Sequence, residues 1–281
     1  MQKTKVIMIL DKSGSMASTA NQAVMNYNEQ IQQFKENSKE QEIKACLITF
    51  NGDVYEHFWA KDAAELEEAE QNSFNPNGGT ALWDAMGYSI KKMKDSDDGE
   101  SSYLVIVISD GVENSSKKYN QSSIKELITE CKATNRWTFS YMGCSLEYVE
   151  KIAQDTGIPL GNCAAWSNKS AQHAFYGYSS MNRNSRMYFD ARARGESSTE
   201  SLCSADGSLA DYSCENTNNA PVDLGAINWS VPSSSVDMVS AVDVSHKSKK
   251  RSIQAFNHVA NYNSAPVVLS GVFNNSSKVV L

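Results

Sequence analysis

The hydrophobic positions of roughly the first 185 residues fall into short, uninterrupted runs that alternate with amphipathic segments. Runs without polar alternation are typical of parallel strands that are covered on both faces of a sheet. Between the runs, apolar residues recur every three or four positions, as in helices that pack one stripe against a sheet. The pattern predicts a doubly wound α/β domain, with a mostly parallel sheet flanked by helices.

The bounds of these elements follow from where each pattern starts and stops. We expect strands at 6–10, 43–50, 54–59, 103–108, 136–142 and 159–165, and helices at 17–37, 62–70, 80–94, 122–133, 146–155 and 170–181. The Asn51-Gly52 pair is a strong hairpin signal between the second and third strands.

The pattern changes near the end of this domain. Residues 186–200 form a polar, charged connector, and residues 201–281 are rich in Ser, Asn, Asp and Ala with weak helical periodicity. The last segment is interpreted either as a small, β-rich module or as a partly ordered extension. We therefore divide the chain into a domain at 1–185, a connector at 186–200 and a small polar module or extension of unknown role at 201–281.

Composition and charge narrow the class of protein. A net charge of −7 argues against a nucleic-acid-binding protein, which would carry a basic face. No apolar run approaches the ~20 residues of a membrane-spanning helix, and residues 1–10 are interpreted as a strand rather than a signal peptide. We therefore expect a soluble, cytoplasmic protein. Among its cysteines, Cys203 and Cys214 are the plausible disulfide pair by sequence proximity.

Oxygen-bearing side chains follow the first predicted strand. Asp11, Ser13 and Ser15 occupy alternate positions, and Gly14 between the serines permits a tight turn. Ligands of an open α/β sheet bind at the carboxyl ends of its strands, which is where Asp11 falls. Carboxylate and hydroxyl oxygens are ligands of hard cations such as Mg²⁺. The segment therefore predicts a metal site.

The Asp11-Lys12-Ser13-Gly14-Ser15 segment resembles the first part of the metal-ion-dependent adhesion site (MIDAS) of von Willebrand factor A domains. In that family, a threonine and an aspartate on two further loops complete the site. Thr80 follows a Gly-Gly turn and Asp110 follows an apolar run, in the order that the family has. The resemblance covers about two-thirds of the chain. It implies a Rossmann-like sheet in which residues 54–59 form an antiparallel edge strand.

The resemblance also implies how the metal would be held. Ser13 and Ser15 would coordinate Mg²⁺ or Mn²⁺ directly, and Thr80 directly or through water. Asp11 and Asp110 would act mainly through water. One coordination position stays open in the family, and a carboxylate of a protein partner fills it. The implied function is cation-dependent protein binding without catalysis.

Three segments place the chain more finely within this resemblance. The segments at 11–16, 78–86 and 109–114 look like those of intracellular bacterial or phage members, similar to tellurite-resistance proteins. Some intracellular relatives work with AAA+ ATPases or assemble larger complexes.

Other interpretations stay open at this point. Asp11 and Ser13 could cap the following helix, Thr80 could cap another, and Asp110 could start a turn. The polar C-terminal third could incorporate the chain into an assembly such as a virus particle. A metal-dependent hydrolase is a weaker alternative, because the histidines are scattered and no nucleophile motif or phosphate loop is present.

Four neighbours of the motif also have two interpretations each. Asp84 and Glu113 could orient the metal ligands or be solvated acids at a helix start. Lys12 could contact an acidic partner or be neutral surface. Trp83 could contact the partner or pack its helix.

Overall fold

A computed structural model describes residues 1–70, 72–165 and 171–196 of the chain. The predictions for the C-terminal module and for a Cys203–Cys214 disulfide lie outside the described residues. Among the described cysteines, Cys46, Cys131 and Cys144 are free thiols. In the part of the chain that the structure describes, no helix is long and apolar enough to cross a membrane.

The described strands form one sheet of six in the order β3-β2-β1-β4-β5-β6. Their bounds are β1 Lys3–Asp11, β2 Glu42–Phe50, β3 Val54–Asp62, β4 Ser102–Ile108, β5 Trp137–Gly143 and β6 Cys163–Ala165. All neighbours pair in parallel except β2 and β3, which pair antiparallel across the Asn51-Gly52 hairpin. The predicted mostly parallel sheet, with its antiparallel edge strand, is confirmed.

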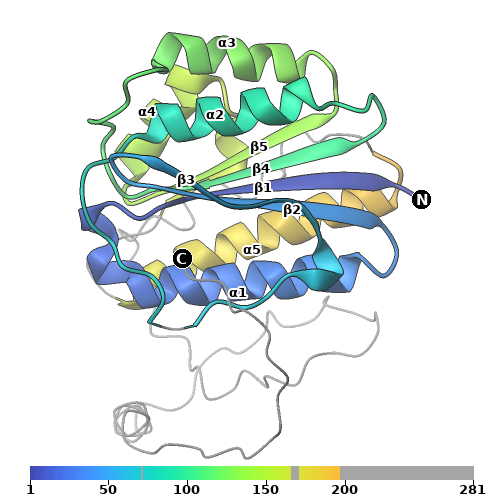
Figure 1. The fold of residues 1–281 in the computed structure, drawn as a ribbon, viewed down its shortest axis with the longest axis horizontal. Coiled ribbons are helices and arrows are strands. Elements are labelled where there is room, and N and C mark those ends of the chain that lie inside the picture. Colours follow the sequence, from blue (N-terminus) through green and yellow to red (C-terminus); the bar gives the residue numbers. More distant parts are fainter. Residues whose placement is uncertain (71, 166–170, 197–281) are drawn as a thin grey trace, which may run out of the picture. The chain divides into compact units, whose positions relative to one another are not determined.

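Helices cover both faces of this sheet (Figure 1). Helices α1 and α5 lie on one face, and α2, α3 and α4 lie on the other. Their bounds are α1 Ala20–Asn37, α2 Leu82–Asp95, α3 Gln121–Lys132, α4 Leu146–Thr156 and α5 Ala171–Ala193. A short 3-10 helix at Gly14–Thr19 precedes α1.

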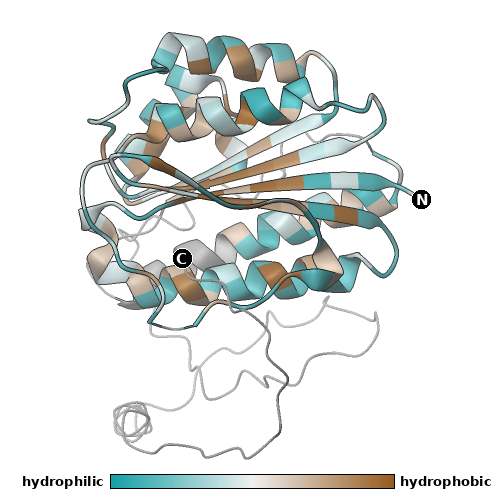
Figure 2. Ribbon diagram, viewed as in Figure 1, coloured by the Kyte–Doolittle hydropathy of each residue, from teal (hydrophilic) through white to brown (hydrophobic). Residues whose placement is uncertain are grey.

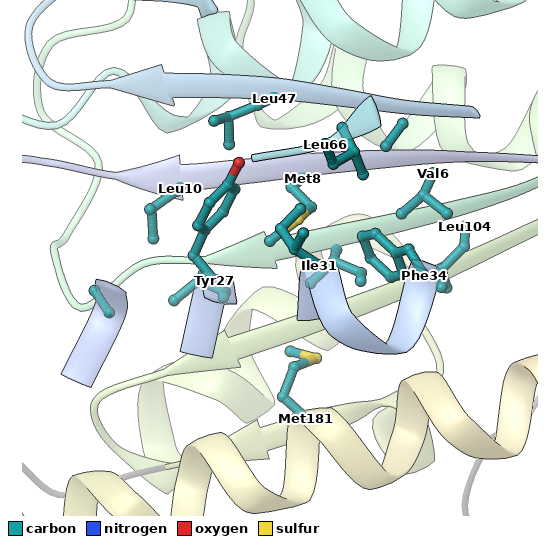
Figure 3. Close-up of a cluster of buried hydrophobic side chains, with 14 of the residues drawn as sticks. Val6, Met8, Leu10, Tyr27, Ile31, Phe34, Leu47, Leu66, Leu104 and Met181 are labelled. Carbon is teal, nitrogen blue, oxygen red and sulfur yellow. The ribbon is translucent and has the colours of Figure 1, made fainter. Parts of the chain in front are cut away.

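The central strands are apolar throughout because both of their faces are buried. In β1, Met8 points into the core under α1, whereas Ile7 and Ile9 point into the core under α2. Figure 3 shows the first of these cores, where Ile31 and Phe34 of α1 pack against the sheet. Figure 2 shows the most hydrophobic residues gathered along the strands.

Three predicted elements differ from the structure. The helix expected at 62–70 is only a 3-10 turn at Ala63–Glu65. The strand expected at 159–165 begins at Cys163, after a 3-10 turn at Leu160–Asn162. The helix expected to end at 181 continues to Ala193, because Tyr188 and Phe189 bury their rings against the α1 side of the core.

Candidate metal centre

The structure brings the oxygen-bearing side chains of the first and third predicted loops together. Asp11 ends β1 and Asp110 follows β4, and these strands are neighbours in the sheet. The Ser15 hydroxyl donates a hydrogen bond to Asp110 Oδ1 at 2.5 Å. The hydroxyls of Ser13 and Ser15 share a further hydrogen bond of 3.1 Å. The two aspartates and the two serines therefore lie together at the carboxyl ends of β1 and β4, which is where ligands of open α/β sheets bind.

Thr80 reaches the same place from the loop before α2. The Gly14 N–H donates to the Gly78 carbonyl at 3.1 Å, which joins this loop to the serine loop. Gly111 lies between Thr80 and Asp11, since a Cβ added to it would lie 2.6 Å from Thr80 Oγ1 and 3.3 Å from Asp11 Oδ2. All five side chains that the sequence singled out thus belong to one site.

The Asp11 carboxylate is fully buried. One of its oxygens accepts the Ser13 N–H at 2.7 Å, and the other accepts the Ser109 hydroxyl at 2.6 Å. Burial raises the pKa of Asp11 to about 6 in spite of these hydrogen bonds, and the charge of Asp110 raises it further. Burial also raises the pKa of Asp110, which is 7% exposed.

The residues present fit a divalent cation. None of the ion pairs within the described ranges includes Asp11 or Asp110, so two neighbouring buried carboxylates have no positive side chain to balance them. Buried charges normally need such a partner. The other donors are the hydroxyls of Ser13, Ser15 and Thr80, which are hard oxygen ligands. Among the described residues no group of three or more His, Cys, Asp or Glu could hold a metal ion, so hydroxyl oxygens would have to supply part of the ligand set.

The helix-capping interpretation is wrong for two of these residues. Ser13 stands at the start of the 3-10 helix but makes no side-chain capping hydrogen bond. The residue that precedes α2 is Ala81 rather than Thr80. Their hydroxyls are therefore available to the site.

Asp84 and Glu113 join the loop that carries Asp110 to helix α2. The Asp84 carboxylate accepts backbone N–H groups from residues 117, 118 and 119, each at 2.8 Å. Partial burial opposes ionisation of Asp84, but these three donors hold its pKa below the usual range. In return, Glu113 accepts the N–H of Trp83 at 3.0 Å in the first turn of α2. We call this reciprocal arrangement the clasp.

Asn114, which directly follows Glu113 of the clasp, fixes Thr80. The Asn114 side chain accepts the Thr80 N–H at 3.0 Å, and the Asn114 N–H donates to the Thr80 carbonyl at 3.0 Å. Asp84 and Glu113 therefore act on the backbone around the site, whereas Trp83 packs against the core under α2.

Two contributors were not predicted. Ser109, which is fully buried, donates to Asp11, and the Cys144 thiol donates to the Asp110 carbonyl at 2.9 Å. The position of Ser109 directly before Asp110 was the available signal. Cys144 follows β5, and nothing in its local sequence shows that β5 lies beside β4.

Comparison with known families gives one match. The family model for the von Willebrand factor type A domain matches residues 5–183. No curated protein matches the chain.

Solved structures with a similar fold come from diverse organisms. The open pilus adhesin SpaC of Lactobacillus rhamnosus GG has a TM-score of 0.50 at 12% identity, over 67% of this chain and 30% of that one. Proximal thread matrix protein 1 of the mussel byssus has a TM-score of 0.46 at 15% identity, over 64% of this chain and 45% of that one. Manganese-loaded TRAP protein of Plasmodium vivax has a TM-score of 0.42 at 14% identity, over 63% and 73% of the two chains. The chain thus spans less than half the length of the mussel protein, and identities this low show the fold alone.

Proposed function

The chain belongs to the von Willebrand factor type A family, and on this premise we propose that it is a non-enzymatic protein-binding module that depends on a divalent cation. Members of this family commonly bind metal and mediate protein interactions. The observation that carries the proposal is the convergence of three hydroxyls on two buried carboxylates that form no ion pair with any residue the structure describes.

We propose that these residues form a complete MIDAS. Ser13, Ser15 and Thr80 would hold the ion through their hydroxyls, and Asp11 and Asp110 would balance its charge directly or through water. Mg²⁺ is the first candidate and Mn²⁺ the second, because a few oxygen donors from separate loops suit an ion that keeps some of its waters. When bound, the ion would supply the positive charge that attracts a carboxylate of the partner.

We propose binding rather than hydrolysis, because no histidine is among the described side chains that converge on the site. A hydrolytic metal site needs a general base near the attacking water. His57, the histidine whose side chain the structure describes, lies on β3. Its ring nitrogen shares a 2.8 Å hydrogen bond with the Thr49 hydroxyl. Burial and the charge of Lys12 lower the pKa of His57.

The proposal extends to the kind of partner and to where the chain acts. From the segments at 11–16, 78–86 and 109–114 we propose that the chain is cytoplasmic and that its partner offers an acidic side chain. Such a partner would be an AAA+ ATPase or a component of a larger assembly. The alternative role as a structural component, for example of a phage particle, depends on residues 201–281, which lie outside the described residues.

Nuclear magnetic resonance tests the proposal even for weak binding. Ac-Gly-Asp-Gly-NH₂ is titrated into ¹⁵N-labelled protein with Mg²⁺, and again after a chelator has removed the ion. We expect saturable shifts of the Gly14 and Gly111 amides with Mg²⁺ only, and none with the Asp→Asn peptide. A Ser13→Ala/Ser15→Ala variant should lose the response, and Ser18→Ala should keep it. Equal shifts with and without Mg²⁺ would contradict the proposal.

A further inference from the structure

We propose that Lys12 and Tyr55 form a second contact for the partner, one that binds a second acidic side chain beside the carboxylate that the metal captures. This inference rests on the proposed function of the metal centre. It assigns the partner a chemistry, which is an acidic loop or peptide with two carboxylates close in sequence.

The position of Lys12 is fixed by its backbone. Its N–H donates to the Phe50 carbonyl at 2.6 Å, and its carbonyl accepts the Asn77 N–H at 2.9 Å. Phe50 ends β2, which lies on the opposite side of β1 from β4 and Asp110. Lys12 therefore borders the site on its β2 side.

The side chain of Lys12 extends further in this direction. Its Nζ lies 5.5 Å from the centroid of the Tyr55 ring, near the start of edge strand β3. The tyrosine is 42% exposed, so the pair is open to solvent at the same end of the sheet as the site. An ammonium group over an aromatic face is weakly held there and keeps its charge available.

Lys12 has no carboxylate partner within the described ranges of the chain. Lys92 gives the contrast. Its Nζ also lies over an aromatic ring, 4.2 Å from the Trp59 centroid, but Glu56 neutralises it through a 2.5 Å ion pair. One cation–aromatic pair is thus internally balanced, and the pair beside the site is not.

The loop after β4 borders the other side of the site, and its first lysine is Lys117, seven residues after Asp110. Val112, two residues after Asp110, is 66% exposed and apolar. A partner carboxylate in addition to the one at the metal would therefore find its complement on the Lys12 side. Charge-assisted hydrogen bonds of this kind add affinity and set the direction in which an acidic segment lies.

The experiment compares peptides with one and with two acids at saturating Mg²⁺. The probes are Ac-Gly-Asp-Gly-Asn-Gly-NH₂ and Ac-Gly-Asp-Gly-Asp-Gly-NH₂, with further two-acid peptides in which zero or two residues separate the acids. For the wild-type protein, we expect the best two-acid peptide to bind about threefold to tenfold more tightly than the one-acid peptide.

The Lys12→Gln variant should lose this gain. Its affinity for the one-acid peptide should stay within about twofold of wild type, and its Mg²⁺ affinity should be equal or higher, because a positive charge near the ion has been removed. Tyr55→Ala should reduce the gain, and Tyr55→Phe should keep it. The matched control is Lys39→Gln, which removes the same charge beyond the far end of α1, about 27 Å away by helix rise.

The possible results separate the two proposals. Failure of the wild-type protein to bind the one-acid peptide would contradict the proposed function, and the second contact would fall with it. Binding of the one-acid peptide with no gain from any two-acid peptide would overturn the second contact alone. So would a gain that survives in Lys12→Gln, or a loss of Mg²⁺ affinity in that variant.

Discussion

The hydroxyl of Ser15 donates a 2.5 Å hydrogen bond to the carboxylate of Asp110, although the two residues lie 95 positions apart. This contact closes the loop after β1 onto the loop after β4. It also aims one hydroxyl and one carboxylate at the same small volume, as a shared ion would require.

Replacing this hydroxyl should weaken the metal site more than the fold. We expect Ser15→Ala to lower the Mg²⁺ affinity at least about tenfold. The free energy of unfolding without metal should change by only about 1 kcal/mol, because Ser15 is exposed and water can replace its hydroxyl. Calorimetric titration and chemical denaturation measure the two effects, with Ser18→Ala as the control. Unchanged Mg²⁺ affinity would remove Ser15 from the site.

The raised pKa of Asp11 predicts how the metal-free protein responds to pH. The pKa is about 6 when folded, against 3.8 for the ordinary side chain. Between these two pH values the folded chain binds a proton at Asp11 that the unfolded chain has released. The contribution of Asp11 to stability is therefore complete below about pH 4 and is lost as the pH rises through 6.

Asp11→Asn should remove this dependence. At pH 7 the metal-free variant should be more stable than wild type, by up to about 3 kcal/mol, and the difference should vanish near pH 4. Denaturation at several pH values with a chelator present measures it, and Mg²⁺ binding should be lost in the same variant. A variant that is less stable than wild type at pH 7 would show that the buried charge is already balanced within the protein.

The positions of the site residues could be predicted because they depend on local patterns. Buried apolar runs mark parallel strands, and the carboxyl ends of neighbouring parallel strands meet at one edge. Asp11 and Asp110 each follow such a run, so their meeting required no knowledge of the side-chain contacts.

The segment at 62–70 could not be predicted because its partners are distant in sequence. The Asn28 side chain of α1 accepts the Ala69 N–H at 2.8 Å and donates to the Ala69 carbonyl at 3.1 Å. The Tyr27 hydroxyl donates to the Glu67 carbonyl at 3.1 Å. These bonds satisfy the backbone without a helix, although the acidic composition favoured one.

The full length of α5 could not be predicted for a different reason. Its buried positions include Asn184 and Ser185, which are 1% and 2% exposed, so the apolar stripe is interrupted. The facing helix α1 is polar there too, and Gln30 donates to the Asn182 side chain at 2.6 Å. A helix that packs through polar residues looks like a connector in the sequence.

The clasp predicts an effect on metal binding from a residue outside the metal ligands. Asp84→Asn removes the charge that accepts three backbone N–H groups. We expect faster hydrogen exchange at the amides of 117–119 and a Mg²⁺ affinity lowered about tenfold. Asp95→Asn, at the exposed end of the same helix, should do neither. Faster exchange with unchanged Mg²⁺ affinity would show that the clasp does not position the site.

Gly111 should not tolerate a side chain. A Cβ there would lie 2.6 Å from Thr80 Oγ1, and Thr80 is buried and branched, so it has little room to move. We expect Gly111→Ala to cost about 1–3 kcal/mol of stability and to abolish Mg²⁺ binding. Gly52→Ala, where a Cβ meets nothing within 4 Å, is the matched control for thermal unfolding and titration. Wild-type metal affinity in Gly111→Ala would contradict the placement of Thr80 at the site.

Calorimetric titration of Mg²⁺ and Mn²⁺ into the metal-free protein shows whether these loops bind a divalent cation. We expect one ion per chain for the wild-type protein, no saturable binding for Asp110→Ala, and binding as in wild type for the Asp95→Ala control. The same titrations are repeated with the one-acid peptide present, since a carboxylate from the partner completes the proposed site. Absence of binding by the wild-type protein in both conditions, or equal binding by Asp110→Ala, would contradict the metal centre.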